Sequence, residues 1–131
     1  MILLDTHVLV WAAISPERLT RRAANAIRRA ETSSGLAVAS ITLWELAFLF
    51  WRGRLRHRGT VEGSLRHVLE VTRVAIKEIS LEIAILAQQF PAPFPSDPQD
   101  RLIAATAIAE GTPLVTADDA IRASPLVRTI W

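Results

Sequence analysis

Residues 96–119, SDPQDRLIAATAIAEGTPLVTADD, join an apolar helical segment to a short apolar run and carry two pairs of acids. Asp97 and Asp100 stand where the helix is expected to begin, at about residue 98. Asp118 and Asp119 follow the run PLVT, and a glycine between the two segments is a typical helix stop. After its first turn the helix has no consistently polar face, which indicates a buried, central position. Acidic residues at the ends of a helix and a strand, with a hydrophobic segment between them, suggest a functional site.

The rest of the chain alternates short apolar runs with helical patterns. The expected strands are residues 1–5, 36–40, 74–80, 113–116 and 126–130. The expected helices are residues 7–13, 19–31, 41–55, 61–72, 81–90, 98–110 and 117–123. Continuous apolar strands such as MILL are typical of parallel sheets covered on both faces. We therefore predict one α/β domain over residues 1–131, a three-layer sandwich whose mostly parallel central sheet of four to five strands is flanked by helices.

The amino-acid composition excludes several classes of protein. Half of the 131 residues are hydrophobic and the mean hydropathy is positive, which argues against disorder. No apolar run approaches the roughly 20 residues of a membrane span, and the N-terminus lacks the basic region of a secretory signal, so we expect a cytoplasmic protein. The absence of cysteine excludes disulfides and thiolate metal sites. The net charge of +2 comes mostly from arginine, which suits phosphates but does not by itself establish nucleic-acid binding.

Four acids are expected at one edge of this sheet. Asp5 follows the first strand, Glu45 lies shortly after the second, Asp100 opens the central helix and Asp118 follows PLVT. The carboxyl ends of parallel strands share one edge, so these side chains should converge. Carboxylates repel one another, by about 1 kcal/mol at about 4 Å in water, and an all-oxygen cluster is suited to Mg²⁺ or Mn²⁺. Such an ion can activate water against a phosphodiester.

Each acid also has a purely structural interpretation. Asp5 can cap the helix that follows, although Thr6 is another expected cap. Thr42 to Glu45 matches a capping box, which needs no catalysis. Asp97 is expected to cap the central helix, and Asp118 or Asp119 the next one, with Asp119 assigned to capping. Only the joint placement of the acids favours a site.

The segments MILLDTHVLVW, WELAFLFWRGRL and DRLIAATAIAEGTPLVTADD, with the overall length, resemble PIN-domain proteins, specifically VapC-type toxins. The resemblance covers essentially the whole chain. It implies a parallel sheet between helices and an Mg²⁺- or Mn²⁺-dependent endoribonuclease, usually a homodimer, silenced by a small VapB-like antitoxin. Thr6 and Thr116 match polar positions that support the site in that family.

The resemblance places the family acids on Asp5, Glu45, Asp100 and Asp118. It implies that Asp5 and Asp100 are the principal metal ligands. Glu45 and Asp118 would complete the ligand shell, directly or through water, and orient the attacking water. His7, beside the first acid, is interpreted as a helix-start residue that points away from the site.

Two surfaces are candidates for contacts with RNA or with the antitoxin. The basic stretch comprises Trp51, Arg52, Arg54, Arg56, His57 and Arg58. It could follow RNA phosphates or be a solvated loop. Phe48, Phe50 and Trp51 give more aromatic surface than one core face requires, which suggests a partner such as the antitoxin. Trp44 is assigned to the core.

The leading functional hypothesis is therefore a metal-dependent endoribonuclease that acts as the toxin of a toxin–antitoxin pair. The first alternative is a non-toxic PIN nuclease in RNA or DNA processing. The second is a non-catalytic binding module, in which the acids only cap helices.

Overall fold

Five short parallel strands and seven α-helices make up the structure, a computed structural model that describes residues 1–131. The strands are β1 (Ile2–Leu4), β2 (Leu36–Ala39), β3 (Ala75–Lys77), β4 (Leu114–Val115) and β5 (Thr129–Ile130). The helices are α1 (Thr6–Ile14), α2 (Arg21–Glu31), α3 (Ile41–Trp51), α4 (Val61–Thr72), α5 (Leu81–Gln89), α6 (Pro98–Ala109) and α7 (Asp119–Arg122). No helix combines the length and hydrophobicity that crossing a membrane requires.

The sheet is built outward from β1. Its strand order is β3-β2-β1-β4-β5, and every pairing is parallel. Leu3 pairs with Ala37 of β2 on one side and with Leu114 of β4 on the other. β1 is therefore the point at which the strand order reverses, where open parallel sheets carry their ligand sites.

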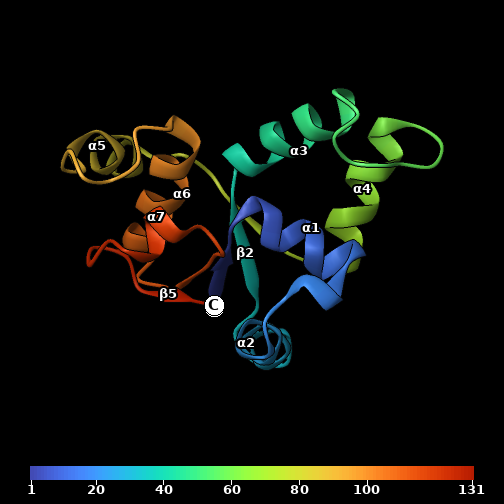
Figure 1. Cartoon of the computed structure of the whole chain (residues 1–131), viewed down its shortest axis with the longest axis horizontal. Helices are drawn as coiled ribbons and strands as arrows, with labels where there is room; N and C mark the ends of the chain where they lie inside the picture. Colours follow the sequence, from blue (N-terminus) through green and yellow to red (C-terminus); the bar gives the residue numbers. More distant parts are fainter.

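Two hydrophobic cores cover the two faces of the sheet. Side chains alternate along a strand, so Leu4 enters a core shared with α1, α2, α3 and α4, while Leu3 enters a core with α5, α6 and α7. Figure 1 shows the second group of helices at the left of the sheet, with α1 and α4 at the right and α2 below. This arrangement confirms the predicted three-layer sandwich.

Hydroxyl side chains set several helix starts. Thr20, Thr60 and Ser80 accept hydrogen bonds from the backbone N–H three residues ahead, at the starts of α2, α4 and α5. The bounds of α4 match the predicted 61–72. Pro16 starts only a 3₁₀ turn (Pro16–Arg18), so α2 begins after Thr20 rather than at residue 19.

Three local predictions were wrong. Thr6 does not cap α1, because Asp5 accepts a hydrogen bond from the Thr6 N–H and Thr6 is already helical. Thr42 forms no capping box, because α3 begins one residue earlier, at Ile41. Trp44 is 55% exposed rather than part of the core, since Leu46 and Phe50 occupy the buried side of α3.

Leu3→Ala tests the importance of the central strand. Leu3 is fully buried, so we expect the free energy of unfolding to fall by about 2–5 kcal/mol. Leu81→Ala is the control, because Leu81 is 78% exposed, and it should change stability by less than about 0.5 kcal/mol. Urea unfolding followed by circular dichroism measures both. Equal effects of the two changes would contradict the assignment of the core.

Candidate active site

The structure brings the four acids together around one cavity of about 450 Å³ at the carboxyl edge of the sheet. Asp5 follows β1, Asp118 follows β4, Glu45 lies in the second turn of α3 and Asp100 in the first turn of α6. The cavity is lined by Asp5, His7, Val8, Trp11, Glu45, Asp97, Asp100, Ala117 and Asp118. Four separate elements thus contribute a carboxylate to one space, and the catalytic role of these acids stays a prediction.

Asp5 is the most deeply buried of these acids, and both of its carboxylate oxygens are fixed. Oδ1 accepts a hydrogen bond from the Thr6 N–H at 2.8 Å, and Oδ2 accepts one from the Thr116 hydroxyl at 2.6 Å. Burial raises the pKa of Asp5, and the two hydrogen bonds oppose that rise by favouring the charged form. Thr116 and Thr6 therefore hold Asp5 in place, as the resemblance implied for supporting residues.

Glu45 is held by a buried pair of threonines. The Thr6 hydroxyl donates to Glu45 Oε1 at 3.1 Å and lies 3.0 Å from the Thr42 hydroxyl. A hydroxyl has one proton, so Thr42 donates to Thr6 when Thr6 donates to Glu45. Burial is the main cause that raises the pKa of Glu45 to about 7, and the charges of neighbouring acids add to it. The Thr42 side chain, which the sequence pattern assigned to a cap, is thus part of this network.

Asp97 and Asp100 stand together at the start of α6. Asp97 caps the helix as predicted, because its Oδ1 accepts from the Gln99 N–H at 2.8 Å, and it also lines the cavity. Burial raises the pKa of Asp100 to about 7, with further contributions from the charges of Asp97, Asp5 and Asp118. The Asp100 carboxylate makes no hydrogen bond within the chain and is free to bind a ligand.

Arg101 fastens this helix start to its surroundings. Its guanidinium donates to the carbonyl oxygens of Pro95 at 2.9 Å, Ala87 at 3.2 Å and Phe90 at 3.5 Å. These bonds tie the first turn of α6 to the end of α5 and to the proline-rich loop. The position of Asp100 therefore depends on a neighbouring side chain that points away from the cavity.

Asp118 lines the cavity and also takes the capping role that was expected for Asp119. Asp118 Oδ1 accepts from the Ile121 N–H at 3.0 Å, so Asp118 caps α7, and the prediction that Asp119 does so was wrong. The Asp119 side chain is 97% exposed, pairs with Arg122 and does not line the cavity. The Thr116 hydroxyl accepts from the Asp118 N–H at 3.1 Å, which links Asp118 to the support of Asp5.

Two aromatic side chains of α1 also face the cavity. His7 was expected to point away, but it lines the cavity, and its charge lowers the pKa of Asp5. Trp11 was not identified from the sequence, and its ring centre lies 6.0 Å from that of His7. A four-residue spacing places two side chains on the same helix face, so their spacing could have indicated this pair.

The donor set fits a hydrated Mg²⁺ ion better than a closed cage. As the side chains lie, no three acidic or histidine groups are close enough together to enclose an ion. Mg²⁺ commonly keeps several waters and uses one or two carboxylates, so it does not need such an enclosure. The raised pKa values of Asp5, Glu45 and Asp100 show that negative charge is unfavourable here without a cation.

Comparison with known proteins identifies the family. The PIN domain model matches residues 2–124. The chain is a PIN-domain protein. Ribonuclease VapC22 from Mycobacterium tuberculosis is 39% identical over 99% of this chain and 98% of its own length.

Solved structures share the fold of this PIN-domain protein at lower identity. VapBC2 from Rickettsia felis, bound to a promoter DNA fragment, superposes with a TM-score of 0.74 at 21% identity, covering 98% of this chain and 97% of the other. DNA-bound VapBC from Salmonella typhimurium gives a TM-score of 0.69 at 22% identity, covering 98% and 97%.

Asp100→Asn tests whether ionisation of Asp100 destabilises the metal-free protein. The pKa of Asp100 is about 7 in the folded protein, above its usual value of 3.8. Between these pH values the unfolded chain ionises while the folded protein retains the proton, so the metal-free protein loses stability as pH rises through this window. Asparagine cannot ionise. We expect Asp100→Asn to have a higher Tm than the unmodified protein at pH 8 in EDTA and no such advantage at pH 4.

The control for this measurement is Glu70→Gln on α4. Glu70 is exposed and does not line the cavity, so its substitution should show no comparable pH-dependent gain. An Asp100→Asn difference that is the same at both pH values would contradict the interpretation.

Proposed function

We propose that this protein is an Mg²⁺- or Mn²⁺-dependent endoribonuclease of the cytoplasm and the toxin of a toxin–antitoxin pair. The observation that carries the proposal is the convergence of four carboxylates from separate elements on one cavity. The name of the 39% identical relative supports ribonuclease activity. The similar structures, among them a toxin–antitoxin complex from Klebsiella pneumoniae, support a toxin.

We assign a different role in metal binding and water activation to each of the four acids. Asp5 and Asp100 would hold the metal ion, with Glu45 and Asp118 as further ligands, directly or through water. When bound, the ion would stabilise negative charge on the phosphate and favour ionisation of a water molecule. Glu45 keeps one oxygen bonded to Thr6, so its other oxygen can orient that water.

The capping alternative accounts for only part of the acid set. Asp5, Asp97 and Asp118 do accept hydrogen bonds from backbone N–H groups at helix starts. Glu45 and Asp100 cap nothing, although burial at this site raises the pKa of both to about 7. Acids that are buried at an electrostatic cost and cap no helix favour a functional site over a purely structural role.

The exposed aromatic side of α3 is the surface that we propose for the antitoxin. Trp51 is 78% exposed, and Trp44 stacks on Phe48 with ring centres 5.6 Å apart. Together with Ala47 and Arg52 they line a shallow cavity of about 250 Å³. An apolar antitoxin segment would cover this surface. The homodimer that the resemblance implies stays a prediction, which light scattering of the purified protein would test.

Asp118→Asn and Asp119→Asn form a matched pair for the nuclease. Asparagine also caps helices, so both variants should fold. Asp118→Asn should reduce RNA cleavage by at least about 100-fold, as should Asp5→Asn and Asp100→Asn, because outer-shell changes alone cost about 10–100-fold. Asp119→Asn should cleave normally, because its side chain lies outside the cavity. Cleavage of structured RNA with Mg²⁺ or EDTA measures this, and activity that persists in EDTA would rule out the mechanism.

Growth arrest separates the toxin from a non-toxic nuclease. Expression of the protein in a bacterial host should stop growth, and expression of Asp100→Asn should not. A cleaving enzyme that leaves growth unaffected would favour the role in RNA or DNA processing.

Trp51→Ala tests the antitoxin surface. Loss of a central exposed tryptophan should weaken binding of the antitoxin encoded beside this gene by about 30-fold, corresponding to about 2 kcal/mol. Leu81→Ala is the control, because Leu81 has the same 78% exposure but lies on α5. Titration calorimetry measures both affinities, and equal affinities would place the antitoxin elsewhere.

A further inference from the structure

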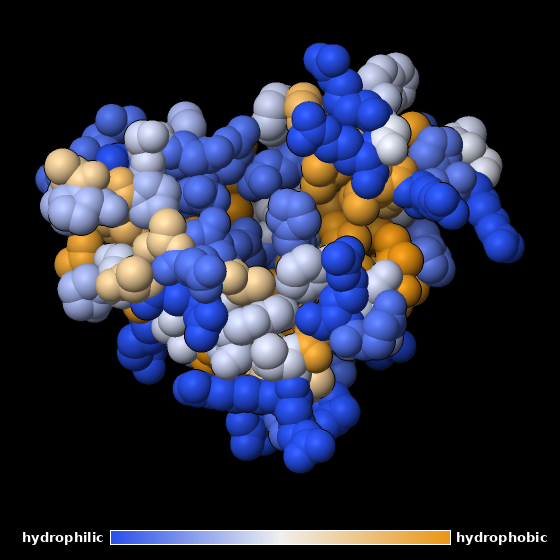
Figure 2. All heavy atoms as spheres, in the orientation of Figure 1, coloured by the Kyte–Doolittle hydropathy of each residue, from blue (hydrophilic) through white to orange (hydrophobic).

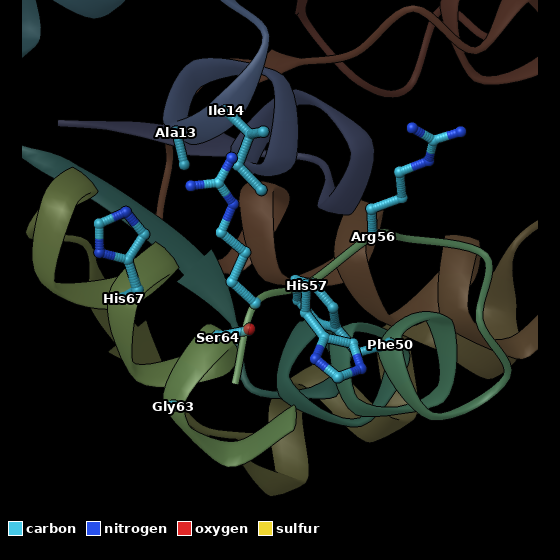
Figure 3. A pocket seen from close by; sticks show the side chains of 9 residues that line it. Ala13, Ile14, Phe50, Arg56, His57, Gly63, Ser64 and His67 are labelled. Atoms are coloured by element: carbon cyan, nitrogen blue, oxygen red, sulfur yellow. The ribbon is translucent and has the colours of Figure 1, made fainter. Parts of the chain in front are cut away.

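A second cavity, of about 490 Å³, lies at the other end of α1 from the acidic one. It is lined by Ala13, Ile14, Phe50, Arg56, His57, Arg58, Gly63, Ser64 and His67. These residues come from the last turn of α1, the end of α3, the connector at residues 52–60 and the first two turns of α4. Figure 2 shows hydrophobic atoms gathered between α1, α3 and α4, with hydrophilic ones around them. In Figure 3, His67 and His57 lie on different sides of the cavity, with Ala13 and Ile14 above them.

The two arginines of this cavity, Arg56 and Arg58, have no acidic partner. No aspartate or glutamate lines it. Arg56 and Arg58 take part in none of the ion pairs or side-chain hydrogen bonds of the structure. His57 uses Nδ1 toward the Gly59 carbonyl at 3.1 Å, which leaves Nε2 free, and His67 makes no hydrogen bond. A concave site with two unpaired arginines and no acid is suited to an anion.

The neighbouring arginines contact aromatic or acidic side chains, unlike the two arginines that line the cavity. The guanidinium carbons of Arg52 and Arg54 lie 5.4 Å and 5.7 Å from the ring centre of Phe48. Arg66 pairs with Glu62 at 2.9 Å. The basic connector is therefore not one uniform solvated loop, because Arg56 and Arg58 are the arginines of the connector that line this cavity without an ion pair or an aromatic partner.

The position of the cavity indicates which anion it takes. The nine residues of α1 span about 14 Å at 1.5 Å per residue. The start of α1 carries His7 and Trp11 into the acidic cavity, and its end carries Ala13 and Ile14 into this one. A few nucleotides of a single strand can cover that distance.

We propose that this cavity, the basic pocket, binds a backbone phosphate of a single-stranded RNA segment a few nucleotides from the bond that is cut. The choice of RNA as the ligand rests on the proposed function. The phosphate is held by Arg56 and Arg58, with His67 as an additional donor. Because backbone phosphates carry no sequence information, the basic pocket adds affinity and sets the position of the strand rather than selecting bases.

The experiment measures RNA binding without cleavage. A fluorescein-labelled oligouridylate of about twelve nucleotides, within the usual span of single-strand sites, is titrated in EDTA and followed by fluorescence anisotropy over a series of salt concentrations. Arg56→Gln/Arg58→Gln should bind roughly tenfold more weakly at low salt, and the slope of log K against log salt should fall by about 0.7 for each phosphate that the variant no longer neutralises. Arg21→Gln/Arg22→Gln, exposed on α2, removes the same charge and should lose much less affinity.

A third variant separates the pocket from the charge of the connector. Ser64→Phe fills the hollow and leaves the net charge unchanged, so it should also weaken binding, after circular dichroism has shown that the variant is folded. The proposal is overturned if Arg56→Gln/Arg58→Gln binds as Arg21→Gln/Arg22→Gln does, or if folded Ser64→Phe binds RNA normally. Every binding measurement is made without metal, so no RNA is cleaved during it. The result therefore stands by itself even if the nuclease assay shows no cleavage.

Discussion

The burial of Asp5 at the end of the central strand is the constraint on which the rest of the site depends. β1 has a neighbour on each side, so the residue that follows it is covered by both halves of the sheet. Desolvation there raises the pKa of Asp5 and works against its charged form. The Thr116 hydroxyl after β4 and the Thr6 N–H at the start of α1 offset that cost, each with one oxygen of the carboxylate. Asp5 can thus be both buried and held in one orientation.

Three of the acids both cap a helix and line the acidic cavity. Asp5, Asp97 and Asp118 each give an oxygen to a backbone N–H and still face the cavity. Folding of the helices therefore fixes where these carboxylates lie before any ligand arrives. Glu45 and Asp100 cap no helix: Glu45 accepts from the Thr6 hydroxyl, and the Asp100 carboxylate makes no hydrogen bond within the chain. Burial and the charges of neighbouring acids raise the pKa of both to about 7, so a bound cation would reduce the cost of ionising them.

The sequence predicted the sheet and the convergence of the acids because both follow from local patterns. Apolar runs locate parallel strands, and parallel strands place their carboxyl ends at one edge. The rotation of each helix was harder to predict, because packing against distant elements decides it. α1 is apolar on nearly all sides, so nothing local directs His7 toward the cavity, and Trp44 lies outside because other residues of α3 face the core. Thr42 fits a capping box in sequence but bonds to Thr6, which is 36 residues away. The bonds of Arg101 to the loop before α6 likewise exist only once the chain has folded, so no spacing rule reveals them.

Under the proposed function, the two ends of α1 would present opposite charge to an RNA strand. The acidic cavity repels a polyanion until a cation occupies it, so it cannot supply the initial attraction. The basic pocket can, because Arg56 and Arg58 have no acidic partner in the chain. Salt-sensitive attraction to phosphates is independent of sequence, which leaves the choice of the bond to groups beside the acids.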